Sequence, residues 1–122
     1  MTITNLILLH RIASGITIAF WATGALTILF SGIWFGKDLL LHILIGVILL
    51  CIAVSLYFRT KAFHHFLQAK WQPIPYTPDA AYSLRRLITW DLVINSFSLL
   101  LSLMIATGAL YRVCVERLPV FG

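Results

Sequence analysis

Three long stretches without a charged residue constrain this chain more than any other feature of its sequence. They cover residues 12–36, 39–58 and 92–111 and contain 25, 20 and 20 residues. A helix needs about 20 apolar residues to cross the hydrocarbon core of a bilayer. Lipid cannot satisfy backbone hydrogen bonds, so a spanning segment is a helix unless short alternating strands close into a barrel, and no such alternation is present. The sequence therefore predicts an all-α integral membrane bundle of three transmembrane helices.

The composition agrees with this prediction and excludes several classes of protein. The chain is 61% hydrophobic and 11% charged, with a mean hydropathy of +0.97, whereas soluble domains are about half apolar and a quarter charged. A soluble enzyme with its own cleft, a disulfide scaffold and a disordered tail are therefore excluded. The sequence contains no phosphate-binding loop, zinc-hydrolase motif or nucleophile–base pair, and nucleic acid is not expected as a partner.

We expect a single membrane domain over residues 1–122, with spans at about 10–36, 39–60 and 85–111 and a connection over residues 61–84. Gly36 and Asp38 predict a tight hairpin between the first two spans, as a helix terminator and an N-cap. Residues 59–70 contain no helix breaker, so helix two should continue beyond the membrane for two or three turns. The proline-rich segment 71–79 then ends it, and Asp79 is a candidate cap for the helix that enters the third span.

The basic residues predict the orientation of the bundle. Three spans put the termini on opposite sides, and the side of the N-terminus carries six basic residues: Arg11, Arg59, Lys61, Lys70, Arg85 and Arg86. The other side carries three: Lys37, Arg112 and Arg117. This excess favours a cytoplasmic N-terminus and an outside C-terminus, with anionic lipid headgroups at the cytoplasmic face. The bacterial inner membrane is the expected location, with the mitochondrial inner membrane as the alternative.

Asp91 is the most costly residue in the apolar spans, because a carboxylate in lipid costs several kcal/mol. It opens a polar and small-residue face of the third span at offsets of 4, 7 and 11: Asp91, Asn95, Ser98 and Ser102. Such offsets place side chains on one side of a helix. One interpretation is a packing surface in which Asp91 pairs with Arg11 or Arg59. The alternative is a proton or quinone site at the cytoplasmic interface.

The four histidines separate by depth in the membrane. His10, His64 and His65 are predicted at the cytoplasmic end, and His42 at the outer end, about 30 Å away. His42 is followed at i+4 by Gly46, which would leave room for a flat macrocycle beside a haem-ligating imidazole. The alternative is a helix–helix hydrogen bond, with Gly46 allowing close approach.

His10 and His64 are expected to approach each other if the tilt of helices one and two brings their cytoplasmic turns together. A haem or metal site would then form at that end. In the alternative, these histidines face water or lipid headgroups.

Two short motifs resemble the cytochrome b membrane-anchor subunits of succinate dehydrogenases. The first is the run His10-Arg11-Ile12-Ala13-Ser14-Gly15, and the second is Ala62-Phe63-His64. The resemblance implies a three-helix anchor with the N-terminus inside. It also implies that His64 ligates a haem b, while His10 and Arg11 contact haem propionates or a quinone.

Two further similarities lead to different expectations. Leu9-His10, Thr23-Gly24 and the run from Leu41 to Gly46 are similar to bacterial dihaem cytochromes b, and imply that His10 and His42 ligate different haems. Thr23-Gly24, Lys37, Arg59 and the run from Leu84 to Asn95 resemble the membrane domain of copper-resistance D-type proteins, which implies metal handling by His10, His64 and His65.

The sequence therefore predicts a non-catalytic membrane-anchor subunit of an electron-transfer complex that contributes to haem b or quinone binding beside other membrane subunits. The candidate cofactor-binding residues are His10, Arg11, His42, His64 and Asp91, with His64 and His42 as haem-iron ligands. The alternatives are a structural or assembly subunit without a cofactor and a metal-handling protein of the copper-resistance type.

Overall fold

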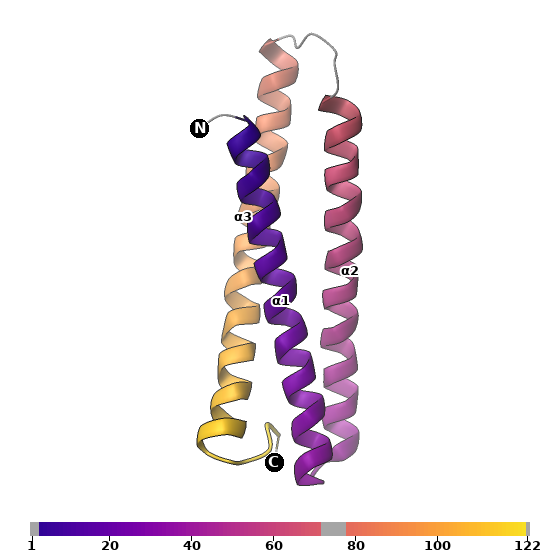
Figure 1. Ribbon diagram of the computed structural model, residues 1–122, viewed down its shortest axis with the longest axis vertical. Helices are drawn as coiled ribbons and strands as arrows, with labels where there is room; N and C mark the ends of the chain where they lie inside the picture. The colour runs from indigo at the N-terminus through magenta and orange to yellow at the C-terminus, as the bar shows by residue number, and fades with distance from the viewer. Residues whose placement is uncertain (1–2, 72–77, 122) are drawn as a thin grey trace.

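The computed structural model describes residues 3–71 and 78–121 as three long helices and a short π-helical turn (Figure 1). The elements are α1 (Ile3–Phe35), α2 (Leu39–Trp71), α3 (Pro78–Leu110) and η1 (Tyr111–Val115). Each of α1 to α3 is long and apolar enough to cross a membrane. The predicted all-α architecture with three membrane-length helices is therefore confirmed.

The helices are longer than the spans that the charge pattern defined. Each contains 33 residues, which is about 50 Å of helix against about 30 Å of hydrocarbon. α2 continues without a break to Trp71, as expected from the absence of a breaker after Arg59. α3 begins at Pro78, a residue suited to a first helical turn because it has no N–H to leave unpaired. Residues 72–77 and the side chain of Asp79 lie outside the description.

The hairpin between α1 and α2 is as tight as predicted. Gly36 has a φ of +63° and ends α1, while its N–H donates to the carbonyl of Gly32 over 3.1 Å. Asp38 has a φ of +46° and precedes the first residue of α2, and its carbonyl accepts the backbone N–H of His42 over 3.1 Å. Glycine has no Cβ and adopts this left-handed conformation at little steric cost, so Gly36 is suited to the position that ends α1.

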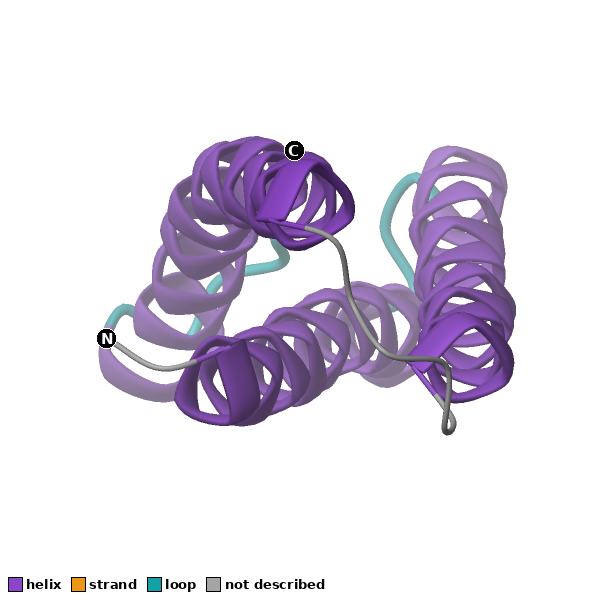
Figure 2. Cartoon of the chain, turned by 90° about the horizontal axis from the view of Figure 1, so that it is seen from above, coloured by secondary structure: helices purple, strands orange, loops and turns teal. Residues whose placement is uncertain are grey.

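α1 is the central helix of the bundle. It packs along both α2 and α3, whereas α2 and α3 hardly touch each other within the described residues. Seen along the helices, the three form an open arrangement rather than a closed ring (Figure 2). The main core follows from this: it is built by Trp21, Ala25 and Ile28 of α1, Leu49 and Ala53 of α2, and Ala109 of α3.

Two glycines allow α1 and α2 to approach closely. A Cβ added at Gly32 would lie 2.4 Å from the Cβ of His42, and one at Gly46 would lie 2.5 Å from the Cγ of Leu29. Leu29 therefore fills the space beside Gly46, where the sequence predicted room for a haem macrocycle next to His42. Both glycines act as contact surfaces between helices, as small residues do in membrane bundles.

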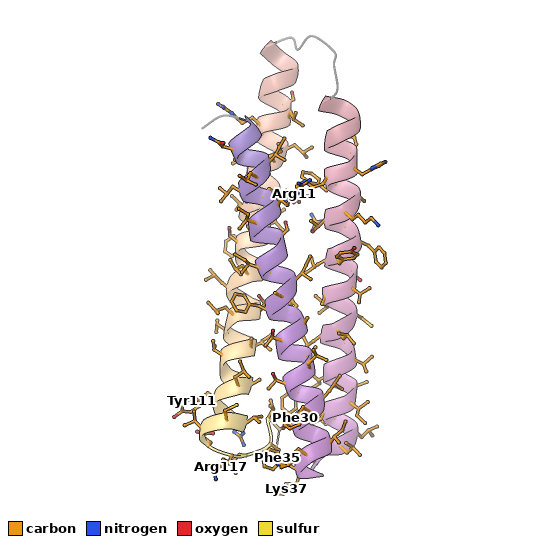
Figure 3. All side chains as sticks on the ribbon, viewed as in Figure 1. Arg11, Phe30, Phe35, Lys37, Tyr111 and Arg117 are labelled. Atoms are coloured by element: carbon orange, nitrogen blue, oxygen red, sulfur yellow. The ribbon has the colours of Figure 1, made fainter. Side chains whose placement is uncertain are left out.

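The charged residues gather at opposite ends of the bundle, as the span prediction requires. Arg11 lies toward the end where α2 finishes and α3 begins, while Lys37 and Arg117 lie at the other end (Figure 3). The side of a membrane that each end faces stays a prediction. The side chain of Lys70 is outside the described part.

Replacing Gly32 by alanine should destabilise the bundle, because the new methyl group would collide with the Cβ of buried His42. We expect a loss of about 1–3 kcal/mol, the usual cost of overpacking. Gly108→Ala is the matched control, since a Cβ there meets nothing within 4 Å and helix propensity favours alanine by up to about 1 kcal/mol. Unfolding followed by circular dichroism in detergent measures both, and equal stability of the two variants would contradict the packing.

Candidate functional site

A chain of hydrogen-bonded side chains joins all three helices near the basic end of the bundle. Nε2 of His64, on α2, lies 3.2 Å from Nδ1 of His10, on α1. Nε2 of His10 bonds to Oδ2 of Asp91 on α3, and Arg59 of α2 donates to Oδ1 of Asp91 over 2.7 Å. The chain therefore runs from His64 through His10 and Asp91 to Arg59.

The two imidazoles of this chain are shielded from solvent. His10 is 1% exposed and His64 is 7% exposed. The His10 ring also contacts the ring of Phe63 at a centroid distance of 4.7 Å, and Phe63 packs against the apolar cluster of Leu6 and Ile88. Asp91 is 19% exposed and Arg59 is 58% exposed, so the chain leads from the buried imidazoles to a guanidinium at the surface of the bundle.

The partners of Asp91 fix the direction of the hydrogen bonds. Its carboxylate accepts from Arg59 at one oxygen and from His10 Nε2–H at the other. When both rings are neutral, a histidine that donates through Nε2 accepts at Nδ1, so His64 donates its own Nε2–H to His10. The N–H groups of His64 and His10 then both point along the chain toward the carboxylate of Asp91. Nδ1 of His64 is the ring nitrogen that keeps a free lone pair.

His64 also borders an open groove between α1 and α2. The groove has a volume of about 860 Å³. Its lining is apolar toward the middle of the bundle and basic toward the end: Gly15, Ile18, Tyr57, Phe58 and Ala62, then Arg11, Thr60, Lys61, His64 and His65. A Cβ added at Gly15 meets nothing within 4 Å, which keeps this side of α1 open. The groove is thus amphipathic, with the buried histidine chain at its edge.

A second, much smaller pocket lies on the Asp91 side of the chain. Its volume of about 20 Å³ is enclosed by residues from all three helices: Ser14, Leu56, Arg59, Thr60, Phe63, Asp91 and Asn95. Nδ2 of Asn95 is buried and has no hydrogen-bond partner among the described residues. A buried polar group of this kind commonly binds an ordered water, and the pocket is large enough for one.

The polar face predicted on the third span lies against α1. Ser98 accepts a hydrogen bond from Nε1 of Trp21 over 2.9 Å, two turns of helix beyond the contact between Asp91 and His10. Ser102 is fully buried, and its hydroxyl donates to the carbonyl of Leu99. The offsets in the sequence therefore identify the face of α3 that meets the central helix.

His42 is fully buried at the opposite end of the bundle, where it holds the C-terminal segment. Its Nδ1 donates to the carbonyl of Asp38 over 2.9 Å, and its Nε2 accepts the N–H of Phe121 over 3.1 Å. The Phe121 ring lies 5.2 Å from the imidazole, and the N–H of Val120 donates to the hydroxyl of Ser31. Both ring nitrogens are therefore occupied by local partners.

The structure brings together three of the five predicted site residues: His10, His64 and Asp91. Arg11 borders the groove instead of pairing with Asp91, which takes Arg59, and His42 lies at the far end. The groove and its residues Gly15, Tyr57 and Lys61 were not predicted, because the groove arises from how α1 and α2 cross. The buried amide of Asn95 lay on the predicted face, although its lack of a partner appears only in three dimensions.

No family model, no curated protein and no solved structure matches the chain. The similarities to cytochrome b anchors, dihaem cytochromes and copper-resistance D-type proteins therefore stay predictions from short motifs. Within residues 3–71 and 78–121, no group of three or more His, Cys, Asp or Glu side chains could hold a metal ion.

Removing the carboxylate of Asp91 should destabilise the protein more than removing its exposed partner. Asp91→Ala leaves the buried Nε2–H of His10 without an acceptor, which costs about 1–3 kcal/mol. Arg59→Ala should cost less than Asp91→Ala, because the side chain of Arg59 is 58% exposed and Asp91 keeps its hydrogen bond to His10. Thermal unfolding in the same detergent measures both variants, and a larger loss for Arg59→Ala would be the contrary result.

Proposed function

We propose that the protein is a membrane subunit of an electron-transfer complex and binds the headgroup of a quinone in the groove between α1 and α2. The observation that carries this proposal is the amphipathic groove with the buried His64–His10–Asp91 chain at its edge. The subunit would bind and orient the quinone and exchange protons with it, while partner subunits would supply the electrons.

The lining of the groove matches the chemistry of a quinone. The headgroup is a flat apolar ring with two carbonyl oxygens that accept hydrogen bonds, and its isoprenoid tail prefers lipid. Tyr57 and Phe58 are exposed aromatic residues of the groove, whereas Arg11 and Lys61 supply donors at its basic end. Pockets of about 300–1,000 Å³ with apolar walls and a few convergent polar groups are typical of small-molecule sites.

The arrangement of His10 and His64 leaves no room for a haem between their rings. The rings of His10 and His64 are in contact, with centroids 5.1 Å apart, so a porphyrin cannot lie between them. Nε2 of His64 faces His10, and both nitrogens of His42 are engaged by Asp38 and Phe121. Within the described residues, the ring nitrogen of these three histidines that keeps a free lone pair is Nδ1 of His64, so ligation of a haem b by this atom stays a prediction.

Further subunits are part of the proposal because the groove is open on one side. Two helices packed on a central one cannot enclose a bound headgroup. In addition, α3 exposes large apolar side chains at Phe97, Leu100 and Met104. A neighbouring membrane chain would cover these surfaces and complete the wall of the quinone site. The basic end would also contact anionic lipid headgroups.

Filling the groove should abolish quinone binding without unfolding the protein. Gly15→Leu places a side chain in open space at the groove, and Gly108→Leu makes the same change in α3, where the added Cβ also meets nothing within 4 Å. A short-chain ubiquinone analogue titrated into protein in lipid nanodiscs, followed by quenching of aromatic fluorescence, should bind to the wild type and to Gly108→Leu. Gly15→Leu should weaken binding at least 10-fold.

Two results would contradict the proposal. One is absence of saturable binding by the wild type to both ubiquinone and menaquinone analogues. The other is equal binding by the two glycine variants, which would place the ligand outside the groove. A reduced-minus-oxidised spectrum of the protein purified with its native partners tests the haem separately: a b-type band lost in His64→Ala would support the haem prediction.

A further inference from the structure

We propose that His64, His10 and Asp91 form a proton relay that carries a proton from the groove to the small polar pocket on the other side of the α1–α2 contact. This inference deepens the proposed function. It rests on the proposed function in one respect, because it takes the bound quinone as the molecule that gives up the proton. The relay itself is a property of these three side chains and their surroundings.

The two ends of the relay open on different sides of the α1–α2 contact. The groove is lined by α1 and α2 alone, and His64 is the member of the relay that borders it. The small pocket is lined by all three helices, and Asp91 is the member that borders that pocket. His10 lies between them, is 1% exposed and borders neither cavity. A proton that crosses the contact along these groups therefore has to pass through His10.

The hydrogen bonds permit transfer in steps that conserve the proton. A hydroxyl in the groove gives its proton to the free Nδ1 of His64, and His64 passes its Nε2 proton to Nδ1 of His10. His10 then passes its Nε2 proton to Oδ2 of Asp91. Each imidazole gains one proton and loses another, and Asp91 ends as the carboxylic acid. Histidine is suited to this task because it accepts and donates at opposite sides of one ring.

The small pocket provides the exit. Its volume of about 20 Å³ is large enough for a single water molecule, and such a water needs two or more polar partners. The carboxylate of Asp91 and the unpartnered Nδ2 of Asn95 supply them. Arg59 borders the same pocket and is 58% exposed, so a proton released by Asp91 to this water is close to the surface of the bundle.

Charges from all three helices surround the relay. Arg11 comes from α1, Arg59 and Lys61 come from α2, and Asp91 comes from α3, while His65 of α2 is a further titratable group at the groove. The positive charges of Arg11 and Lys61 stand on the groove side of the path. The carboxylate of Asp91 stands beside His10 at the other end, where it is paired with the guanidinium of Arg59.

Breaking the relay at His10 while keeping a hydrogen-bond acceptor there tests the proposal. His10→Asn presents an amide oxygen to His64, although an amide cannot take up and pass on a proton. The probe is a hydroxynaphthoquinone, a quinone-type weak acid whose absorbance changes when its hydroxyl ionises. It is bound to protein in nanodiscs and subjected to a rapid rise in pH in a stopped-flow instrument.

We expect His10→Asn to bind the probe within about twofold of the wild type and to slow its ionisation at least 10-fold. His42→Asn, the same substitution at the opposite end of the bundle, should leave the ionisation rate unchanged. Circular dichroism establishes that both variants are folded. Equal ionisation rates for the wild type and His10→Asn would overturn the relay.

A second measurement tests the relay without any ligand, so its failure differs from failure of the proposed function. Nitrogen NMR of protein labelled at histidine reports which ring nitrogen carries the proton. At neutral pH the relay requires His10 and His64 to be protonated at Nε2 and unprotonated at Nδ1, even if no quinone binds. Protonation of His64 at Nδ1 together with an unprotonated Nε2 would reverse the required direction and overturn the inference.

Discussion

The pairing of one carboxylate controls the architecture of the basic end. Asp91 lies in a helix that is otherwise apolar at this level, and an isolated charge there would cost several kcal/mol. It is stabilised by one partner from α1 and one from α2, so the same interaction that neutralises it also joins α3 to the other two helices. The otherwise sparse contact between α2 and α3 makes the Arg59–Asp91 pair a principal link between them.

The fold could be predicted from the sequence because a bilayer leaves few choices. Uncharged runs of 20 residues or more have to be helices, and Gly36 marks the hairpin between the first two, although the helices extend beyond the charges that flank the runs. The periodic face from Asp91 to Ser102 likewise identified the side of α3 that meets α1. These inferences depend on local spacing, which a single sequence displays directly.

Only part of the candidate site could be predicted from the sequence. The sequence showed that His10, His64 and Asp91 have similar depths, and it named both Arg11 and Arg59 as partners for the carboxylate. The choice between them depends on the rotation and tilt of each helix, as do the groove beside Gly15 and the engagement of His42 by Phe121. Rotation is set by contacts such as Gly32 against His42, which join residues that no local pattern connects.

The fold-back of the last residues has a practical consequence. After η1 the chain reverses, with Arg117 at a φ of +55°, and its backbone is held by Ser31 of α1 and His42 of α2. The C-terminal segment therefore packs against the end of α1 and α2 and contacts both helices. A label attached within this segment would disturb its contacts with Ser31 and His42, so a labelling site elsewhere is the safer choice.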